Sequence, residues 1–178
     1  MSHCLMFSTS DLANAKVRGD SSIDPQYEIK TVYDKDAQPH PRLATVIRNA
    51  GGKEVGVWTR KWAREPDRVS IRGGAPVRLL EWLSLSSGFT SARTFRAPDG
   101  RTYAWKEHMF STSLKLVDGE SGRTVATAKK GPRRIEYEPE VVPILDAVLM
   151  AYLVCVERQR ASSNSTKGTV QALAGGIQ

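Results

Sequence analysis

Cysteine is scarce in this chain of 178 residues, which has only Cys4 and Cys155. Two thiols so far apart in the sequence do not build a disulfide framework, so we expect a cytoplasmic protein. The N-terminal stretch MSHCLMFSTSDLANAK has neither a basic start nor a continuous apolar run, which argues against a signal peptide. Cys155 lies inside an apolar run and is expected to be a small core residue.

Motifs of catalytic and metal sites are also missing from the sequence. The three histidines are scattered, with no His-Glu-x-x-His sequence and no cysteine–histidine spacing that suits zinc. There is no G-x-S-x-G turn for a nucleophilic serine, and Gly51-Gly52-Lys53 lacks the rest of a phosphate-binding loop. We therefore expect neither a metal nor a cofactor.

His108 and Asp146 are the catalytic candidates that remain. His108 follows Glu107, but adjacent residues of a strand point to opposite faces, so we expect no direct pairing of the two. Asp146 lies in an apolar helical run, where a carboxylate is costly unless a partner satisfies it. We favour a structural role in which Asp146 caps backbone amides near the start of that helix.

Up to Glu138, apolar and polar residues alternate in short segments bounded by turn residues. Strands are expected over 3–8, 27–33, 42–49, 53–58, 67–72, 92–97, 101–106, 113–118, 123–130 and 133–138, while 77–83 fits a strand or a helical turn. About eleven short strands separated by turns are typical of a β-sandwich or a β-barrel. Asp99-Gly100 is a hairpin signal, and after it Tyr103 and Trp105 share one strand face that we expect in the core.

The pattern changes in VVPILDAVLMAYLVCVERQR (141–160), where Asp146 is the only charged residue before Glu157. A helix that is apolar on all sides must be enclosed by protein or by lipid. A membrane span needs about 20 apolar residues, more than this run supplies. We therefore expect a buried central helix over 140–160, and a membrane anchor through 141–156 is the alternative. The Gly- and Ser-rich residues 161–178 are expected to form a disordered tail.

Several segments of residues 3–160 together resemble the tubby C-terminal-like superfamily, which includes LURP-one-related and scramblase-like proteins. Within it, the chain looks closest to an uncharacterised fungal domain family. The segments that carry the resemblance are 27–31, 44–48, 81–83, the block FRAPDGRTYAWK (95–106), and 145–158. The resemblance implies one domain over residues 1–160, a closed antiparallel barrel of about 11–12 strands around the C-terminal helix. It also implies phosphoinositide binding by basic residues on the barrel exterior.

The chain is basic, with a formal net charge of +7, which favours anionic partners. Two segments, 59–72 and 129–134, concentrate the positive charge, the first around a tryptophan. Charge beside an indole suits an anionic lipid interface. The candidate residues for binding an anion or a lipid are Arg60, Lys61, Trp62, Arg64, Arg68, Arg72, Lys129, Lys130, Arg133 and Arg134.

We therefore expect a non-enzymatic binding module for an anionic phospholipid or a phosphorylated small ligand, cytoplasmic with possible peripheral contact to a membrane. A solvated basic rim without a ligand would give the same charge pattern. Another alternative is an enzyme or accessory protein of small-molecule metabolism with a cleft near Asp146 at the barrel mouth. Nucleic acid is disfavoured as a partner because the sequence has no recognition helix, RNP-like motif or zinc finger.

Overall fold

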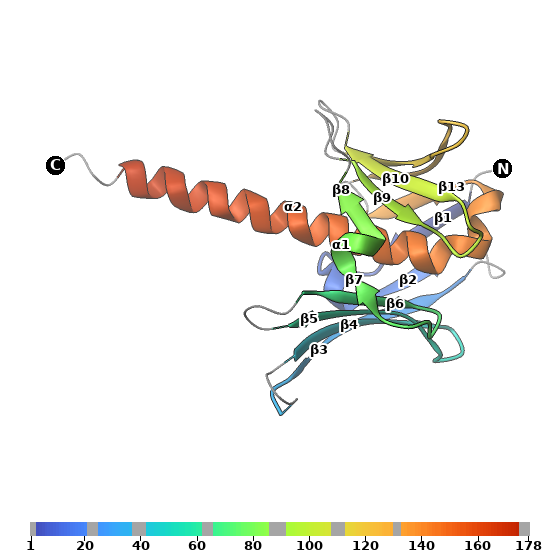
Figure 1. Cartoon of the computed structure of the whole chain (residues 1–178), viewed down its shortest axis with the longest axis horizontal. Coiled ribbons are helices and arrows are strands. Elements are labelled where there is room, and N and C mark those ends of the chain that lie inside the picture. The colour runs from blue at the N-terminus through green and yellow to red at the C-terminus, as the bar shows by residue number, and fades with distance from the viewer. Residues whose placement is uncertain are drawn as a thin grey trace.

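A computed structural model of the chain shows one large β-sheet and one long C-terminal helix (Figure 1). It describes residues 3–20, 25–36, 42–61, 66–85, 92–107, 113–129 and 133–174, with the backbone alone at residues 34, 42, 61 and 162–174. The sheet has 13 strands in the order β7-β6-β5-β4-β3-β2-β1-β13-β12-β11-β10-β9-β8. Every pairing between neighbouring strands is antiparallel. The expectation of a mainly β protein with one C-terminal helix is confirmed.

The elements follow one another in simple order along the chain. The strands are β1 (His3–Phe7), β2 (Ala15–Gly19), β3 (Tyr27–Asp34), β4 (Arg42–Asn49), β5 (Glu54–Lys61), β6 (Arg68–Ile71), β7 (Val77–Arg78), β8 (Leu83–Leu85), β9 (Arg93–Arg96), β10 (Thr102–Glu107), β11 (Ser113–Asp118), β12 (Thr124–Lys129) and β13 (Arg134–Tyr137). The helical elements are η1 (Leu12–Asn14), α1 (Leu79–Trp82), η2 (Pro139–Ile144) and α2 (Leu145–Ala174).

The two edge strands of the sheet, β7 and β8, are neighbours in the sequence, joined only by the single turn of α1. Because so short a connection spans only a few residues, the sheet must curl until its edges approach each other. Among the described strands β7 and β8 do not pair, so hydrogen bonds do not close the sheet. The closed barrel that the resemblance implies is therefore not confirmed, because the β7 and β8 edges are not hydrogen-bonded to each other.

The curled sheet encloses α2. Every side chain from Ala147 to Cys155 is at most 5 % exposed. Nine consecutive positions point in all directions around a helix of 3.6 residues per turn, so protein must surround this segment. Figure 1 shows α2 passing between β8–β10 on one side and β3–β6 on the other. The expected buried central helix is confirmed, and Cys155 is the core residue that its sequence context predicts.

The same helix passes a test for membrane spans. Residues Pro139–Ala161 are long and apolar enough to cross a bilayer by length and composition, but 72 % of the tested window is buried inside the protein. The sheet comes close enough to account for this burial. Gly56 on β5 lies so close to α2 that a Cβ atom at this position would be 3.0 Å from the Met150 Cε. The apolar surface of the helix is therefore used in the core.

Trp105 and Tyr103 lie in the core, as their alternation on β10 predicts. Trp105 is fully buried, donates a hydrogen bond from Nε1 to the Val148 carbonyl oxygen at 3.3 Å, and packs on Tyr152 with ring centroids 5.6 Å apart. Tyr103 is 3 % exposed and donates its hydroxyl to Asp99 Oδ2 at 2.8 Å. This bond ties the strand to the hairpin turn that precedes it.

Three elements differ from the expectation. The pattern misses β2, where only Ala15 and Val17 alternate inward between charged residues. Segment 77–83 divides into β7, α1 and the start of β8 instead of forming one element. Helix α2 continues to Ala174 where we expected a disordered tail from residue 161. The first turn of a helix is the unfavourable step in helix formation, and the buried part of α2 already provides it. The residues after Arg160 contain no proline that would stop the helix from extending.

Candidate anion-binding surface

Arginines from several elements gather where α2 leaves the sheet. Burial raises the pKa of Tyr152, and the charges of Arg133 and Arg160 offset part of the rise. Burial also raises the pKa of Cys155 to about 12, and Arg93 and Arg158 act against that rise. Tyr152 and Cys155 lie less than one turn apart on α2, so these four arginines lie near the same part of the helix. We define the arginine cluster as Arg60, Arg93, Arg133, Arg158 and Arg160.

Arg60 reaches this level from the end of β5. Its Cζ lies 4.1 Å from the centroid of the Trp58 ring, and its Nη2 donates to Thr45 Oγ1 at 2.6 Å. Burial lowers the pKa of Arg60, and the charges of Glu157 and Asp67 oppose that shift. The Arg60 Nε is buried without a hydrogen-bond partner. This guanidinium is therefore positioned by an aromatic ring and a threonine, with its charge incompletely compensated.

The remaining cluster arginines differ in how firmly they are held. Arg160 pairs with Glu157 at 2.9 Å and donates to the Ser10 carbonyl oxygen at 3.0 Å. Arg158 lies 3.9 Å from Asp67, a loose ion pair between partly exposed side chains. The Arg133 Nη1 is buried without a partner. Among the described residues, Asp67 and Glu157 form ion pairs with Arg158 and Arg160 of this five-arginine cluster.

Two exposed apolar side chains lie beside the cluster. Tyr33 is 59 % exposed and Leu85 is 60 % exposed. Leu85 on β8 is paired in register with Arg93 on β9. Tyr33 on β3 and Arg60 on β5 are both paired in register with Leu43 on the strand between them, β4. Strand register therefore places apolar and aromatic surface next to positive charge at this end of the sheet.

Comparison with known protein families matches residues 10–162 to DUF6593, a family of unknown function. The chain belongs to this family. No curated protein matches the chain, and no solved structure does so either. What the DUF6593 domain does must therefore be argued from its own residues.

Some residues of the two predicted basic segments of the DUF6593 domain form internal pairs. Lys129 lies 3.0 Å and Arg134 lies 2.8 Å from the same Glu136 carboxylate oxygen. Arg68 donates to the Pro76 carbonyl oxygen at 3.4 Å. These partners compensate part of the charge that the sequence shows. The side chain of Lys61 and the residues Trp62, Arg64 and Lys130 lie outside the described part of the chain.

Arg60 and Arg133 are the predicted residues that the structure brings together in the cluster. The sequence prediction did not include Arg93, Arg158 or Arg160. For Arg158 and Arg160 a signal was available, because the first basic residues after a buried helical run mark the point where the helix emerges. For Arg93 no local signal exists, since its place depends on the register of β9 with β8 and β10.

Asp146 does not cap local amides as we expected. Its Oδ1 accepts a hydrogen bond from the Tyr27 hydroxyl at 3.0 Å, and its Oδ2 accepts one from Arg72 Nε at 2.6 Å. Tyr27 lies at the start of β3 and Arg72 lies in the turn after β6, both far from Asp146 in the sequence. A charged arginine satisfies a carboxylate better than neutral amides do. Burial and the charge of Asp146 raise the pKa of Tyr27, which stays protonated. Arg72, a predicted anion-binding residue, is therefore already engaged.

The residues that the structure describes contain no group of three His, Cys, Asp or Glu side chains able to hold a metal ion. His108 lies outside the described ranges. The other catalytic candidate, Asp146, accepts hydrogen bonds at both oxygens. An enzyme with its cleft at Asp146 therefore receives no support from the described part of the DUF6593 domain.

Proposed function

We propose that this DUF6593 domain is a non-enzymatic binding module that docks on an anionic lipid surface through the arginine cluster. One observation carries the proposal: arginines of the cluster and the exposed side chains of Tyr33 and Leu85 lie at the same end of the sheet. Cationic groups attract anionic headgroups, and aromatic and apolar side chains settle at the boundary of the hydrocarbon. The phosphorylated small ligand of the sequence analysis would not need these exposed apolar side chains.

The charge of the cluster is available to a lipid phosphate. The Arg133 Nη1 is buried without a partner, so rotating this guanidinium toward a phosphate would gain a hydrogen bond and lose none at that atom. Arg158 is held only by its 3.9 Å pair with Asp67, and loose surface pairs of this kind contribute little stability. Rearranging these two side chains to meet a headgroup is therefore inexpensive.

The sheet is also proposed to close around α2 as a barrel of the tubby C-terminal-like kind. Two features support this: the burial of α2 on all sides and the single turn that separates β7 from β8 in the chain. A barrel of this kind keeps its central helix in the core and leaves its exterior to bind. An experimental structure would test the proposal, because closure requires hydrogen bonds between the β7 and β8 edges.

Sedimentation with lipid vesicles tests the proposed function. We expect the full chain to sediment with vesicles of phosphatidylcholine that contain phosphatidylserine or a phosphoinositide, and not with phosphatidylcholine alone. Each Lys or Arg near an anionic surface contributes about 1 kcal/mol. Replacing Arg133, Arg158 and Arg160 with Ala should therefore weaken binding about a hundredfold. Raising the salt concentration should weaken the wild type as well.

A matched variant removes three positive charges from the opposite end of the sheet. Lys53, Arg96 and Arg123 lie at the β5 start, the β9 end and the β12 start, and their replacement with Ala should weaken vesicle binding far less. Equal losses in the two triple variants would show that only net charge matters. Sedimentation with neutral vesicles to the same extent as with anionic ones would overturn the proposal.

A further inference from the structure

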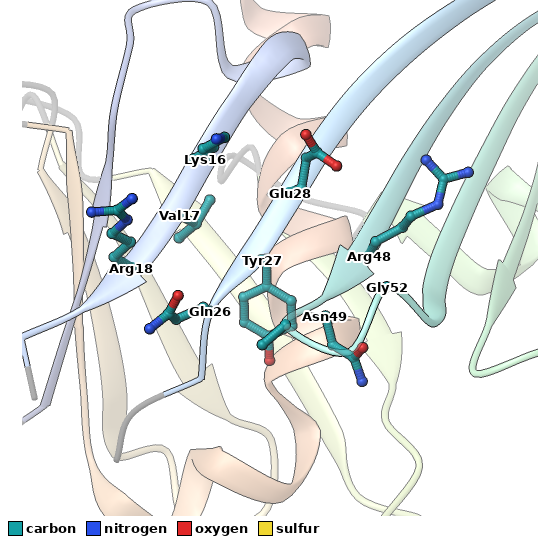
Figure 2. A pocket seen from close by; sticks show the side chains of 10 residues that line it. Lys16, Val17, Arg18, Gln26, Tyr27, Glu28, Arg48, Asn49 and Gly52 are labelled. Atoms are coloured by element: carbon teal, nitrogen blue, oxygen red, sulfur yellow. The ribbon is translucent and has the colours of Figure 1, made fainter. Parts of the chain in front are cut away.

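A pocket of about 290 Å3 opens on the sheet across β2, β3, β4 and the turn between β4 and β5 (Figure 2). Its polar lining consists of Lys16 and Arg18 on β2, Gln26 before β3, Glu28 on β3, and Arg48 and Asn49 on β4. Three of these side chains are cationic and one is a carboxylate. None of them belongs to the basic segments 59–72 and 129–134.

Strand register explains how these charges come together. Lys16 is the partner of Glu28, and Glu28 is the partner of Arg48. Since neighbouring strands lie about 4.8 Å apart, the three side chains form a row across the outer face of the sheet. Arg18 follows Lys16 at a spacing of two residues and so points to the same face. Figure 2 shows Lys16 and Arg18 side by side on β2, with Glu28 beyond them on β3.

Most of the cationic charge at the pocket is uncompensated. Among the described residues, the side chains of Lys16 and Arg18 form no hydrogen bond or ion pair, and both are exposed. Arg48 is the exception, because its Nη2 lies 2.7 Å from Glu54 Oε1 on β5. Glu28 lies between Lys16 and Arg48 in the strand register, and among the described residues it forms no ion pair with either. The pocket therefore attracts anions even though it contains one carboxylate.

The turn after β4 forms one rim of the pocket. Asn49 Oδ1 accepts hydrogen bonds from the backbone nitrogens of Gly51 and Lys53, both at 3.1 Å. Gly52 has φ +75°, a conformation that favours glycine, so the turn holds this shape at little cost. The turn therefore gives this side of the pocket a fixed shape, and Asn49 and Gly52 both line it.

We propose that this pocket binds the phosphate group of a small soluble phosphomonoester. Such a group carries close to two negative charges at pH 7, which matches an excess of cations over carboxylates at the pocket. The guanidinium of Arg18 suits the paired oxygens of a phosphate, and Lys16 adds a point charge beside it. The volume is at the small end of ligand sites. Glu28 then accepts a hydrogen bond from a hydroxyl group of the same ligand.

This site is separate from the arginine cluster. Arg48 of the pocket and Leu43, the partner of Arg60, lie five positions apart on β4, which corresponds to about 17 Å along a strand. A ligand small enough for the pocket does not span that distance. The two proposals therefore have separate variants, and either can fail without the other.

Calorimetric titration of the full chain with glycerol 3-phosphate, inorganic phosphate and glycerol tests the pocket. We expect saturable binding of glycerol 3-phosphate, weaker binding of inorganic phosphate and none of glycerol. Arg18→Ala should weaken glycerol 3-phosphate binding at least tenfold. Glu28→Gln should strengthen the binding of inorganic phosphate severalfold. Inorganic phosphate has no alcohol hydroxyl group to donate to Glu28, so for this probe the carboxylate contributes only repulsion.

Lys30→Ala is the matched control, since Lys30 is an exposed cation on β3 that does not line the pocket. It should leave both affinities unchanged, and all variants should melt as the wild type does because these side chains are exposed. Equal weakening in Lys30→Ala and Arg18→Ala would overturn the proposal, as would the absence of saturable binding. Vesicles that contain phosphatidic acid distinguish a soluble ligand from a lipid headgroup. If the protein binds these vesicles through Arg18 but binds neither soluble phosphate, the pocket is a lipid-headgroup site and the proposal of a soluble ligand is refuted.

Discussion

Arg72 Nε donates a hydrogen bond to Asp146 Oδ2 at 2.6 Å. The pair joins the end of β6 to the first turn of α2, two segments that are 74 residues apart in the sequence. Tyr27 reaches the other carboxylate oxygen from the start of β3. Arg72 adopts φ +52°, the only positive φ of a non-glycine residue that the structure describes. A strained backbone and a charged contact thus coincide where the helix enters the sheet.

Removing the Asp146 carboxylate should destabilise the domain. In Asp146→Ala the Tyr27 hydroxyl is left buried without an acceptor, at a cost of about 2 kcal/mol. Arg72 contributes less, because its side chain is 44 % exposed and can turn to water. The free energy of unfolding, measured by denaturant titration, should fall by about that amount. Asp146→Asn keeps an acceptor and should lose about half as much.

Arg72 allows the contact and the backbone strain to be separated. Arg72→Ala loses the ion pair and keeps a Cβ in the left-handed region, whereas Arg72→Gly loses the pair and relieves the strain. The glycine variant should therefore be more stable than the alanine variant by about 1 kcal/mol. Equal stabilities would mean that the backbone at this position stores no strain.

The enclosure of α2 predicts the behaviour of charges introduced along it. Leu149 is fully buried, so Leu149→Lys places an unpaired ammonium in the core at a cost of several kcal/mol. This variant should lose its native strand spectrum by circular dichroism. Val142 on η2 is 39 % exposed, and Val142→Lys should fold and melt close to the wild type. A native melting curve for Leu149→Lys would contradict the enclosed helix.

The secondary structure was largely predictable because its signals are local. Alternation located β3, β4 and β11 within one residue of their ends. A long apolar run, in which Asp146 is the only charged residue before Glu157, identified the buried part of α2. The pair Tyr103 and Trp105 needed only strand alternation to be assigned to the core. In each case neighbouring residues carry the whole pattern.

The candidate sites were less predictable because they depend on contacts between distant segments. The sequence shows Asp146 as a lone carboxylate, and nothing near it points to Arg72 or Tyr27. The pocket row of Lys16, Glu28 and Arg48 exists only through the register of three strands. Charge density alone selected residues such as Lys129, whose charge Glu136 partly compensates.

Trp105 should be one of the most sensitive core positions. Trp105→Ala should lower the free energy of unfolding by about 3–5 kcal/mol, the usual range for a large truncation in a core. Trp105→Phe keeps part of the ring and loses the hydrogen bond to the Val148 carbonyl, so it should cost less than the alanine variant. Denaturant titration measures both values. A surface role for Trp105 would instead leave the stability of both variants near that of the wild type.

Tyr103 predicts a loss of stability at alkaline pH. Burial and the hydrogen bond to Asp99 raise the pKa of Tyr103 to about 12, from an ordinary value of 10.0. Because the folded state favours the protonated phenol, the resulting stabilisation is fully present below pH 10 and is lost as pH rises from about 10 to 12. The difference in unfolding free energy between wild type and Tyr103→Phe should therefore shrink over this range.

Asp99→Asn provides the control for this titration, because it removes the negative charge beside the Tyr103 hydroxyl and keeps an oxygen that can accept the hydrogen bond. Tyrosinate absorbance, compared with that of the Tyr103→Phe protein, should show the Tyr103 transition near pH 12 in the wild type. In Asp99→Asn the transition should move toward the ordinary range, since loss of a nearby carboxylate makes the phenolate easier to form. A wild-type transition near pH 10 would contradict the buried environment of Tyr103 and its contact with Asp99.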